Sequence, residues 1–305
     1  MKRTLIAAAL LALIPLGAHA APATGTTVLF TPAAGKEQLA YHSYGTGPTV
    51  VVLNGGPGLN GLYMESVAQT IAADGYRAIL FDQRGTGASV KAATEKDKLT
   101  MQGTIDDIES LRQQLNQDKL VFVTHSFGGT MALAYTAAHP NRVAKLILSG
   151  STGTDLSTVG LFAKRLNERM TPEERVQYAA YGKANNDSAA LNIQLLAEFD
   201  DREKAKALIK TLPQPFIYSA VSNAIGTDFD KNFHVAKTIN AYHGYVALIT
   251  GSDDAAILME PALIKAFPDA TVIHVAHSGH WPWLENPQQF NAALKAALAT
   301  DHFAQ

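Results

Sequence analysis

Residues 120–129 read LVFVTHSFGG, and this stretch decides the fold. Its first four residues form a short apolar run, which is typical of a buried strand. A strand that leads directly into a serine, followed by glycines that open a helix, predicts a nucleophile on a tight turn. Neighbours two positions from such a serine must be small, because the backbone there is strained. Gly128 fits this requirement and Thr124 departs from it. Alternatively, Ser126 is simply the N-cap of a helix beginning at Phe127.

Other apolar runs of the same kind are spread along the chain, and most end at polar or glycine residues. Continuous apolar strands without alternation are typical of a parallel sheet that is covered by helices on both faces. These predicted strands are 49–53, 77–81, 120–123, 145–148, 245–249 and 271–275. The pattern therefore predicts an α/β fold.

Helical periodicity fills the spaces between these strands, for example over 104–116 and 290–298. The alternation of strand and helix stops between residues 155 and 243, where charged residues and helix formers dominate. An insertion of this kind usually lies over the carboxyl edge of the sheet, where ligands bind. We therefore expect a core made of residues 21–154 and 244–305, with residues 155–243 as a helical cap.

The first 20 residues have the pattern of a signal peptide. Lys2 and Arg3 precede an apolar stretch from Leu5 to Leu16, and Ala18-His19-Ala20 is a small-x-small cleavage site. The apolar stretch is too short to span a bilayer, which disfavours a membrane anchor. We expect cleavage near Ala20 and a periplasmic or secreted protein.

Composition excludes several classes of protein. The chain has 305 residues, of which 47% are hydrophobic and 17% charged, with a formal net charge of −2 and no cysteine. The first two values are typical of a globular protein. Near-neutral charge argues against nucleic-acid binding. The lack of cysteine excludes a disulfide framework and a thiol nucleophile. No feature implies a cofactor or sets the oligomeric state.

Candidate partners for Ser126 follow the last two predicted strands. Asp253 and Asp254 come after the first of these, and His277 and His280 after the second. A serine nucleophile needs an imidazole base and a carboxylate that orients it. The order Ser, Asp, His is that of α/β-hydrolases. The two aspartates could also belong to a simple turn.

His274, His277 and His280 raise the alternative of a metal site. Their spacing of three would bring them together on a helix, but this stretch leaves a strand, from which the rings diverge. No suitably placed carboxylate completes the set. We therefore expect no metal.

Two further motifs give the chain a family resemblance. Residues 54–58, NGGPG, and 82–89, DQRGTGAS, resemble the HGGPG and DQRGxGxS signatures of proline iminopeptidases. These are serine peptidases of the α/β-hydrolase fold that remove N-terminal proline from peptides. The block from Gly279-His280 to Phe290 is similar to the C-terminal histidine block of that family. The resemblance covers about 28–150 and 245–298, and the cap shows no match.

The resemblance implies roles for individual residues. Ser126 would be the nucleophile and His280 the general base and then acid. Asp254 would orient His280 because the family pattern is Gly-x-x-Asp, with Asp253 as the alternative. The oxyanion hole would use the backbone N–H of Phe127 and one from the Gly55-Gly56 turn.

Substrate recognition is less well defined by the sequence. Asn54 stands where the family has histidine, and it could still form a hydrogen bond beside the oxyanion turn. The family binds the substrate amine with cap carboxylates, for which Glu198 and Asp201 are candidates. Asp200 and Glu203 are further candidates, although the charged stretch 198–206 is more simply a solvated helical face. We expect Asp82, Arg84 and Ser89 to brace the loop beside the site and to take no part in the chemistry.

Three functions are therefore open. The first is a serine aminopeptidase that acts on short peptides, and the second is an ester hydrolase on the same fold, because fold does not fix substrate. The third is a non-catalytic binding protein that retained the scaffold. Loss of a triad residue would favour the third function, and none is lost in this sequence.

Overall fold

A computed structural model describes residues 24–33, 35–154, 156 and 159–300. The predicted signal peptide lies outside the described residues. The strands are β1 (Thr26–Phe30), β2 (Leu39–Tyr44), β3 (Thr49–Leu53), β4 (Arg77–Asp82), β5 (Leu120–His125), β6 (Val143–Ser149), β7 (Tyr245–Gly251) and β8 (Thr271–Val275). The main core helices are α1 (Glu65–Ala73), α2 (Met101–Gln114), α3 (Phe127–Ala138), α9 (Glu260–Ala266), α10 (Pro282–Glu285) and α11 (Pro287–Ala299).

The eight strands form one sheet in the order β1-β2-β4-β3-β5-β6-β7-β8. Strands β3 to β8 are parallel, whereas β2 runs antiparallel to both β1 and β4. All six predicted strands are confirmed. The sequence pattern did not indicate β1 and β2, because the apolar run of β1 is short and His42 and Ser43 interrupt that of β2.

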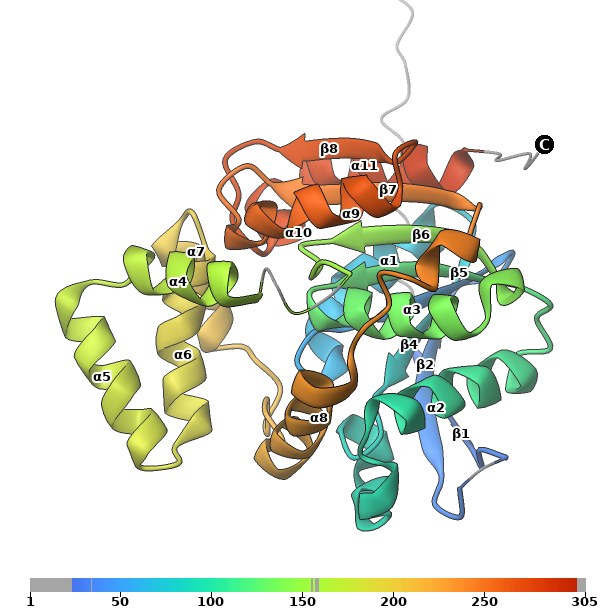
Figure 1. Cartoon of the computed structure of the whole chain (residues 1–305), viewed down its shortest axis with the longest axis horizontal. Coiled ribbons are helices and arrows are strands. Elements are labelled where there is room, and N and C mark those ends of the chain that lie inside the picture. Colours follow the sequence, from blue (N-terminus) through green and yellow to red (C-terminus); the bar gives the residue numbers. More distant parts are fainter. Residues whose placement is uncertain (1–23, 34, 155, 157–158, 301–305) are drawn as a thin grey trace, which may run out of the picture.

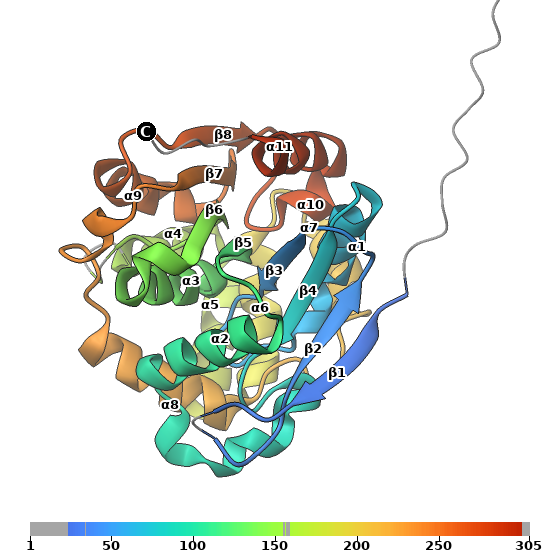
Figure 2. The same ribbon diagram turned by 90° about the vertical axis from the view of Figure 1, so that its right-hand side faces the viewer.

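Successive residues of the central strands point into two separate hydrophobic layers. In β3, for example, Val51 and Leu53 pack in one layer and Val50 and Val52 in the other. Helices α2, α3 and α9 cover the first layer, while α1 and α11 cover the second (Figure 2). Both faces are therefore buried, which explains why the strands are apolar throughout.

Within the described residues, five α-helices follow β6 before the chain returns to the sheet at β7. They are α4 (Val159–Arg169), α5 (Pro172–Lys183), α6 (Asp187–Glu198), α7 (Arg202–Ile209) and α8 (Ser219–Asn232). The described part of 155–243 contains no strand of the sheet. Helices α4 to α7 stand to one side of the sheet, beyond the carboxyl end of β6 (Figure 1). We refer to residues 155–243 as the cap segment.

Among the helices of the described ranges, none is both long and apolar enough to cross a membrane.

Candidate active site

Ser126 occupies the turn between β5 and α3 in a strained conformation. Its φ is 53° and its ψ is −122°, which few residues other than glycine adopt. Holding such a conformation costs about 1–3 kcal/mol, and strain of this size is typical of functional sites. The side chain makes no capping hydrogen bond to α3. The alternative of a simple N-cap is therefore wrong.

Two glycines make this turn possible. A Cβ on Gly128 would lie 2.1 Å from the carbonyl oxygen of Leu53, so no side chain fits there. A Cβ on Gly129 would lie 1.8 Å from Ser151 Oγ and 3.3 Å from Thr124 Oγ1. The missing side chain at Gly129 thus leaves room chiefly for Ser151, and Thr124 also lies close to it.

Asp254 and His280 form a buried pair at the ends of β7 and β8. Both carboxylate oxygens of Asp254 lie 3.0 Å from His280 Nδ1. Asp253 instead is exposed and accepts a hydrogen bond from its neighbour Ser252. The geometry therefore selects Asp254 of the two aspartates. Gly150 lies against the pair, since a Cβ there would be 2.8 Å from Asp254 Oδ2 and 2.9 Å from the His280 ring.

The three histidines of 274–280 do not converge. His274 Nε2 is bound to Glu260 Oε2 at 2.8 Å, on the side of β8. His277 is exposed and lies in the left-handed region with a φ of 52°. Within the described ranges, no group of three or more His, Asp or Glu side chains is arranged to hold a metal ion.

The Gly55-Gly56 turn lies beside Ser126. A Cβ on Gly55 would be only 3.0 Å from Ser126 Cβ, so glycine is needed for this approach. The N–H of Gly55 donates to Tyr63 Oη at 2.6 Å. The Gly55 N–H is therefore already hydrogen-bonded. In this turn, the N–H of Gly56 is the remaining candidate for a second oxyanion donor.

Gln83 holds the same turn from behind. Its side-chain amide donates to the carbonyl oxygens of Asn54 and Gly55, each at 3.0 Å, and accepts from the Gly58 N–H at 3.1 Å. Sequence reasoning did not single out Gln83, although it lies inside the DQRGTGAS motif. The motif thus supports the NGGPG loop through Gln83.

Asn54 is part of this support and not of a binding surface. Its amide nitrogen donates to the carbonyl oxygens of Gly55 and Leu59, each at 3.0 Å, and the residue is fully buried. It does not line the cavity described below. The prediction that Asn54 contacts substrate is therefore wrong, because its side chain is turned into the loop.

Asp82, Arg84 and Ser89 brace the loop that follows β4, as predicted. Arg84 Nε donates to Asp107 at 2.8 Å, and Arg84 is buried. Ser89 Oγ donates to the carbonyl oxygen of Asp82 and accepts from the Ala40 N–H. Asp82 also accepts from the Ala88 N–H, and one of its oxygens lies 3.1 Å from His42 Nε2. These contacts are structural.

Ser126 and His280 open into one cavity of about 230 Å³. The Gly55-Gly56 turn lines the core side. The cap segment contributes four apolar side chains and three polar ones, namely Phe162, Leu191, Leu195, Ile217, Gln194, Glu198 and Ser222. The cavity therefore lies between the carboxyl ends of the strands and the cap helices.

Among the described residues of the cap segment, Glu198 is the one carboxylate in this cavity wall. It is only 6% exposed. Its Oε2 accepts from Trp281 Nε1 at 2.8 Å and its Oε1 from Gln194 at 2.7 Å, while its main-chain oxygen accepts from the His280 N–H. The prediction of a solvated face is thus wrong at Glu198.

The other acidic candidates of this stretch lie outside the cavity. Asp201 is exposed and caps α7 by accepting from the N–H groups of Glu203 and Lys204. Asp200 and Glu203 are exposed as well. Asp201 therefore has a structural role at the helix N-terminus, and the assignment of a substrate contact to it is wrong.

Comparison with known proteins agrees with this architecture. The family model of the alpha/beta hydrolase fold matches residues 48–287. The chain belongs to the α/β-hydrolase fold family. A proline iminopeptidase of Lactobacillus delbrueckii subsp. bulgaricus is 27% identical over 266 residues, covering 80% of this chain and 88% of the relative. A proline iminopeptidase of Arabidopsis thaliana is 39% identical over 104 residues, covering 34% of this chain and 27% of the relative. The resemblance to this group of peptidases is confirmed.

Solved structures support the fold of this α/β-hydrolase. A carboxylesterase structure from Nitrososphaera gargenis superposes with a TM-score of 0.67 at 19% identity. It covers 89% of this chain and 98% of the other. At this identity the likeness concerns the fold alone.

Electrostatics in the hydrolase centre on His280. Its burial disfavours a charged ring, but the charge of Asp254, the hydrogen bond that His280 Nδ1–H donates to it and the charge of Glu198 together outweigh burial. They raise the pKa of His280 to about 9. The site is therefore built to stabilise an imidazolium.

Arg169, at the end of α4, connects the cap segment of the hydrolase to its core. Its guanidinium donates to the carbonyl oxygens of Ala197 and Phe199, at 2.7 and 2.6 Å, and to that of Asp253 at 2.9 Å. A cation here satisfies carbonyl groups that the end of α6 leaves free. Arg169 thus holds the main chain on both sides of Glu198, and it also holds the main chain of Asp253, which is next to Asp254. No sequence motif indicated it.

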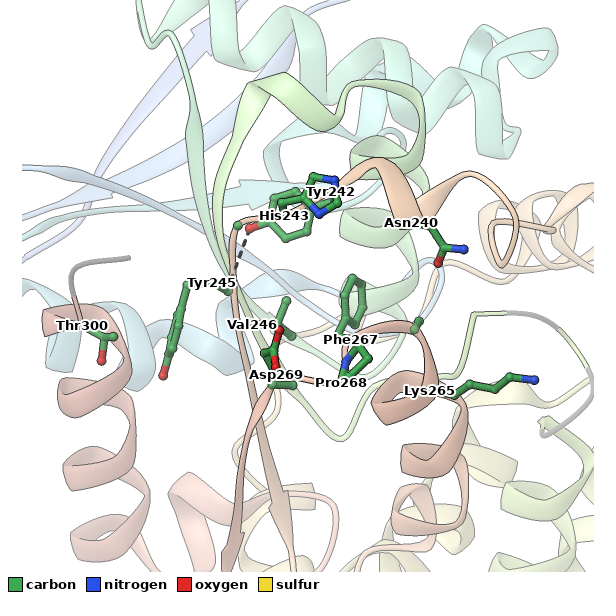
Figure 3. A pocket seen from close by; sticks show the side chains of 13 residues that line it. Asn240, Tyr242, His243, Tyr245, Val246, Lys265, Phe267, Pro268, Asp269 and Thr300 are labelled. Carbon is green, nitrogen blue, oxygen red and sulfur yellow. Dashed lines mark hydrogen bonds between the residues drawn. The ribbon is translucent and has the colours of Figure 1, made fainter. Parts of the chain in front are cut away.

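A larger cavity, of about 550 Å³, lies at the opposite edge of the sheet. It is formed around the starts of β7 and β8, and Tyr242, Tyr245, Phe267 and Asp269 are among the residues that line it (Figure 3). None of the predicted site residues lines it. The larger cavity is therefore separate from the candidate site around Ser126.

Proposed function

We propose that the protein is a serine hydrolase in which Ser126, His280 and Asp254 form the catalytic triad. The observation that carries this proposal is the Asp254–His280 pair, whose histidine lines the same cavity as a serine held at a strained turn. A triad is recognised by such geometry and roles.

The reaction would be acyl transfer to Ser126. His280 Nε2 takes the proton of Ser126 Oγ as the oxygen attacks the substrate carbonyl. The N–H groups of Phe127 and Gly56 stabilise the oxyanion, since fixed donors aimed at developing charge lower the barrier. His280 then donates its proton to the leaving group, and water releases the acyl group by the reverse sequence.

The substrate we favour is a short peptide with a free N-terminus, as in proline iminopeptidases. Glu198 supports this choice, because it is a buried carboxylate in the cavity wall. Its two oxygens accept one hydrogen bond each from protein groups, and an ionised carboxylate has further acceptor positions for an ammonium group. The curated relatives named above support the same choice.

An ester is the second candidate substrate. The cavity wall is largely apolar around Glu198, with Phe162, Leu191, Leu195 and Ile217. Such a surface also suits the acyl chain of a carboxylic ester.

We also propose that the protein is exported and that residues 155–243 act as a cap over the site. Cleavage near Ala20 would give a mature protein that begins at Ala21. The mass of the protein recovered from the periplasm or medium tests the proposed export and cleavage. A chain that retains residues 1–20 would contradict it.

Hydrolysis of prolyl-p-nitroanilide and of a p-nitrophenyl ester, each with the purified protein and its Ser126→Ala variant, tests the proposed reaction. We expect turnover of both substrates, and its loss in the variant. Ester turnover without anilide turnover would retain the triad and remove the peptidase assignment. Equal turnover by the variant would overturn the role of Ser126.

A further inference from the structure

A chain of hydrogen bonds runs from the oxyanion turn to the main chain of His280. The Gly55 N–H donates to Tyr63 Oη at 2.6 Å, and Tyr63 Oη lies 2.7 Å from His125 Nδ1. On the other side of the ring, His125 Nε2 lies 2.9 Å from the carbonyl oxygen of His280. Tyr63 belongs to the short helix Gly61–Met64, and His125 is the last residue of β5, directly before Ser126.

The position of each proton in this chain follows from its neighbours. A carbonyl oxygen only accepts, so His125 Nε2 must carry a hydrogen and donate it to His280. Burial and the nearby charge of His280 hold the pKa of His125 well below its usual value, which leaves the ring neutral. A neutral ring with a hydrogen on Nε2 accepts at Nδ1. Tyr63 therefore donates to His125 while accepting from Gly55.

The surroundings bury both side chains almost completely, and His125 also lines the cavity beside Ser126. Tyr63 and His125 pack against Trp281 and Trp283, with ring centroids between 4.7 and 6.2 Å apart. Glu198 and His280 are the charged or titratable side chains that act electrically on this pair. Burial, more than the charge of Glu198, keeps the pKa of Tyr63 above its usual value, so the hydroxyl retains its proton. Every polar atom of the pair that could bond has a partner inside the protein.

We propose that Tyr63 and His125 are positioning residues that hold the oxyanion turn and the main chain of His280 in fixed relation on either side of Ser126. The proposal rests on the triad proposed above. Neither side chain needs to give up or take a proton during turnover. Their effect is to fix the Gly55 peptide and the main chain of His280 relative to the nucleophile. A displacement of about 1 Å in such a site costs up to about a hundredfold in rate.

Kinetics of Tyr63→Phe test the proposal. The variant keeps the ring but leaves the Gly55 N–H and His125 Nδ1 without partners. We expect kcat for a p-nitrophenyl ester to fall by about tenfold to a hundredfold, with KM changed by less than about threefold. Tyr242→Phe is the matched control, because it also removes one buried tyrosine hydrogen bond, to the Tyr245 carbonyl oxygen at the far edge of the sheet. A fall in kcat no larger than that of the control would overturn the proposal.

Two substitutions of His125 separate positioning from packing. Glutamine can place an amide N–H near the position of Nε2 and keep the bond to His280, whereas asparagine is too short to reach it. We expect His125→Gln to retain at least about tenfold more kcat than His125→Asn. Equal kcat in the two variants would contradict a role through the His280 carbonyl.

The ring of His125 gives a readout that does not depend on activity. We expect its ¹⁵N spectrum in the unmodified protein to show a neutral ring protonated at Nε2 throughout the range from about pH 5 to pH 9. A hydrogen on Nδ1, or titration within this range, would overturn the proposal even if Tyr63→Phe fails to fold. Loss of the Ser126-dependent reaction would instead remove the triad and leave this spectrum unchanged.

Discussion

The two walls of the cavity are built by different means. On the core side, Ser126 comes directly after β5, and Asp254 and His280 come in the loops after β7 and β8, so the sheet itself brings them to one edge. On the cap side, Glu198 is at the end of α6 and depends on contacts with distant residues, namely Trp281, His280 and Arg169. The core wall is therefore specified by local sequence and the cap wall by tertiary contacts. The proposed chemistry lies on the first wall and the proposed substrate choice on the second.

Among the substitutions that distinguish the role of the core wall from that of the cap wall, we expect the substitution of Asp254 to have the largest effect. Asp254→Ala removes the group that orients His280, and we expect kcat to fall by at least about 10³-fold for peptide and ester substrates alike. Steady-state kinetics with both substrates measure this effect. Asp253→Ala is the matched control, and we expect less than about a threefold change because that side chain is exposed. Similar losses in the two variants would contradict the assignment of Asp254.

Substitution of Glu198 is expected to separate substrate choice from chemistry. In Glu198→Gln, kcat/KM for prolyl-p-nitroanilide should fall by about 10²-fold, because a buried charge pair with the substrate amine is lost. Hydrolysis of the ester should continue. Glu203→Gln, an exposed carboxylate of the same stretch, should leave both activities unchanged. Equal losses for both substrates in Glu198→Gln would contradict a role in amine binding.

The same variant gives a prediction on pH. Since the reaction needs a neutral His280, kcat/KM for the ester should rise with pH toward the pKa of about 9. The charge of Glu198 contributes to raising that pKa. Its removal should lower the pKa of His280 and move the acid limb of the pH profile to lower pH. A shift to higher pH, or none, in the ester profile would contradict this electrostatic coupling.

The smallest expected effect concerns the connection between the two walls. Arg169→Met removes three hydrogen bonds from a partly exposed guanidinium, and we expect a loss of about 2 kcal/mol in the free energy of unfolding. Urea denaturation measures it. Arg165→Met, which removes only an exposed ion pair with Glu168, should cost less than about 0.5 kcal/mol. Equal losses would show that Arg169 does not join cap and core.

The sequence predicted the core wall well because its signals are local. Apolar runs located the six parallel strands, and Gly251 set the count that favoured Asp254 over Asp253. The antiparallel β1 and β2 were missed, because the apolar run of β1 is short and polar residues interrupt that of β2. Asn54 was misassigned since the motif gives its position but not the direction of its side chain.

Residues that act through tertiary contacts could not be found in this way. Glu198 resembles its exposed neighbours in sequence, and only the approach of Trp281 and His280 buries it. Tyr63 and Arg169 lie in no recognised motif. Gln83 lies inside a recognised motif, yet its partners belong to a loop about 25 residues earlier. The roles of these residues can be predicted only when it is known which segments of the chain meet in space.

Covalent labelling of Ser126 tests the central claim most directly. An active-site fluorophosphonate reacts with a serine that an adjacent base activates, and it reports on the core wall without reference to the substrate. We expect one adduct per chain, located at Ser126 by peptide mass spectrometry and absent from Ser126→Ala. A correctly folded protein that takes no label, or that takes it equally in the variant, would contradict the account.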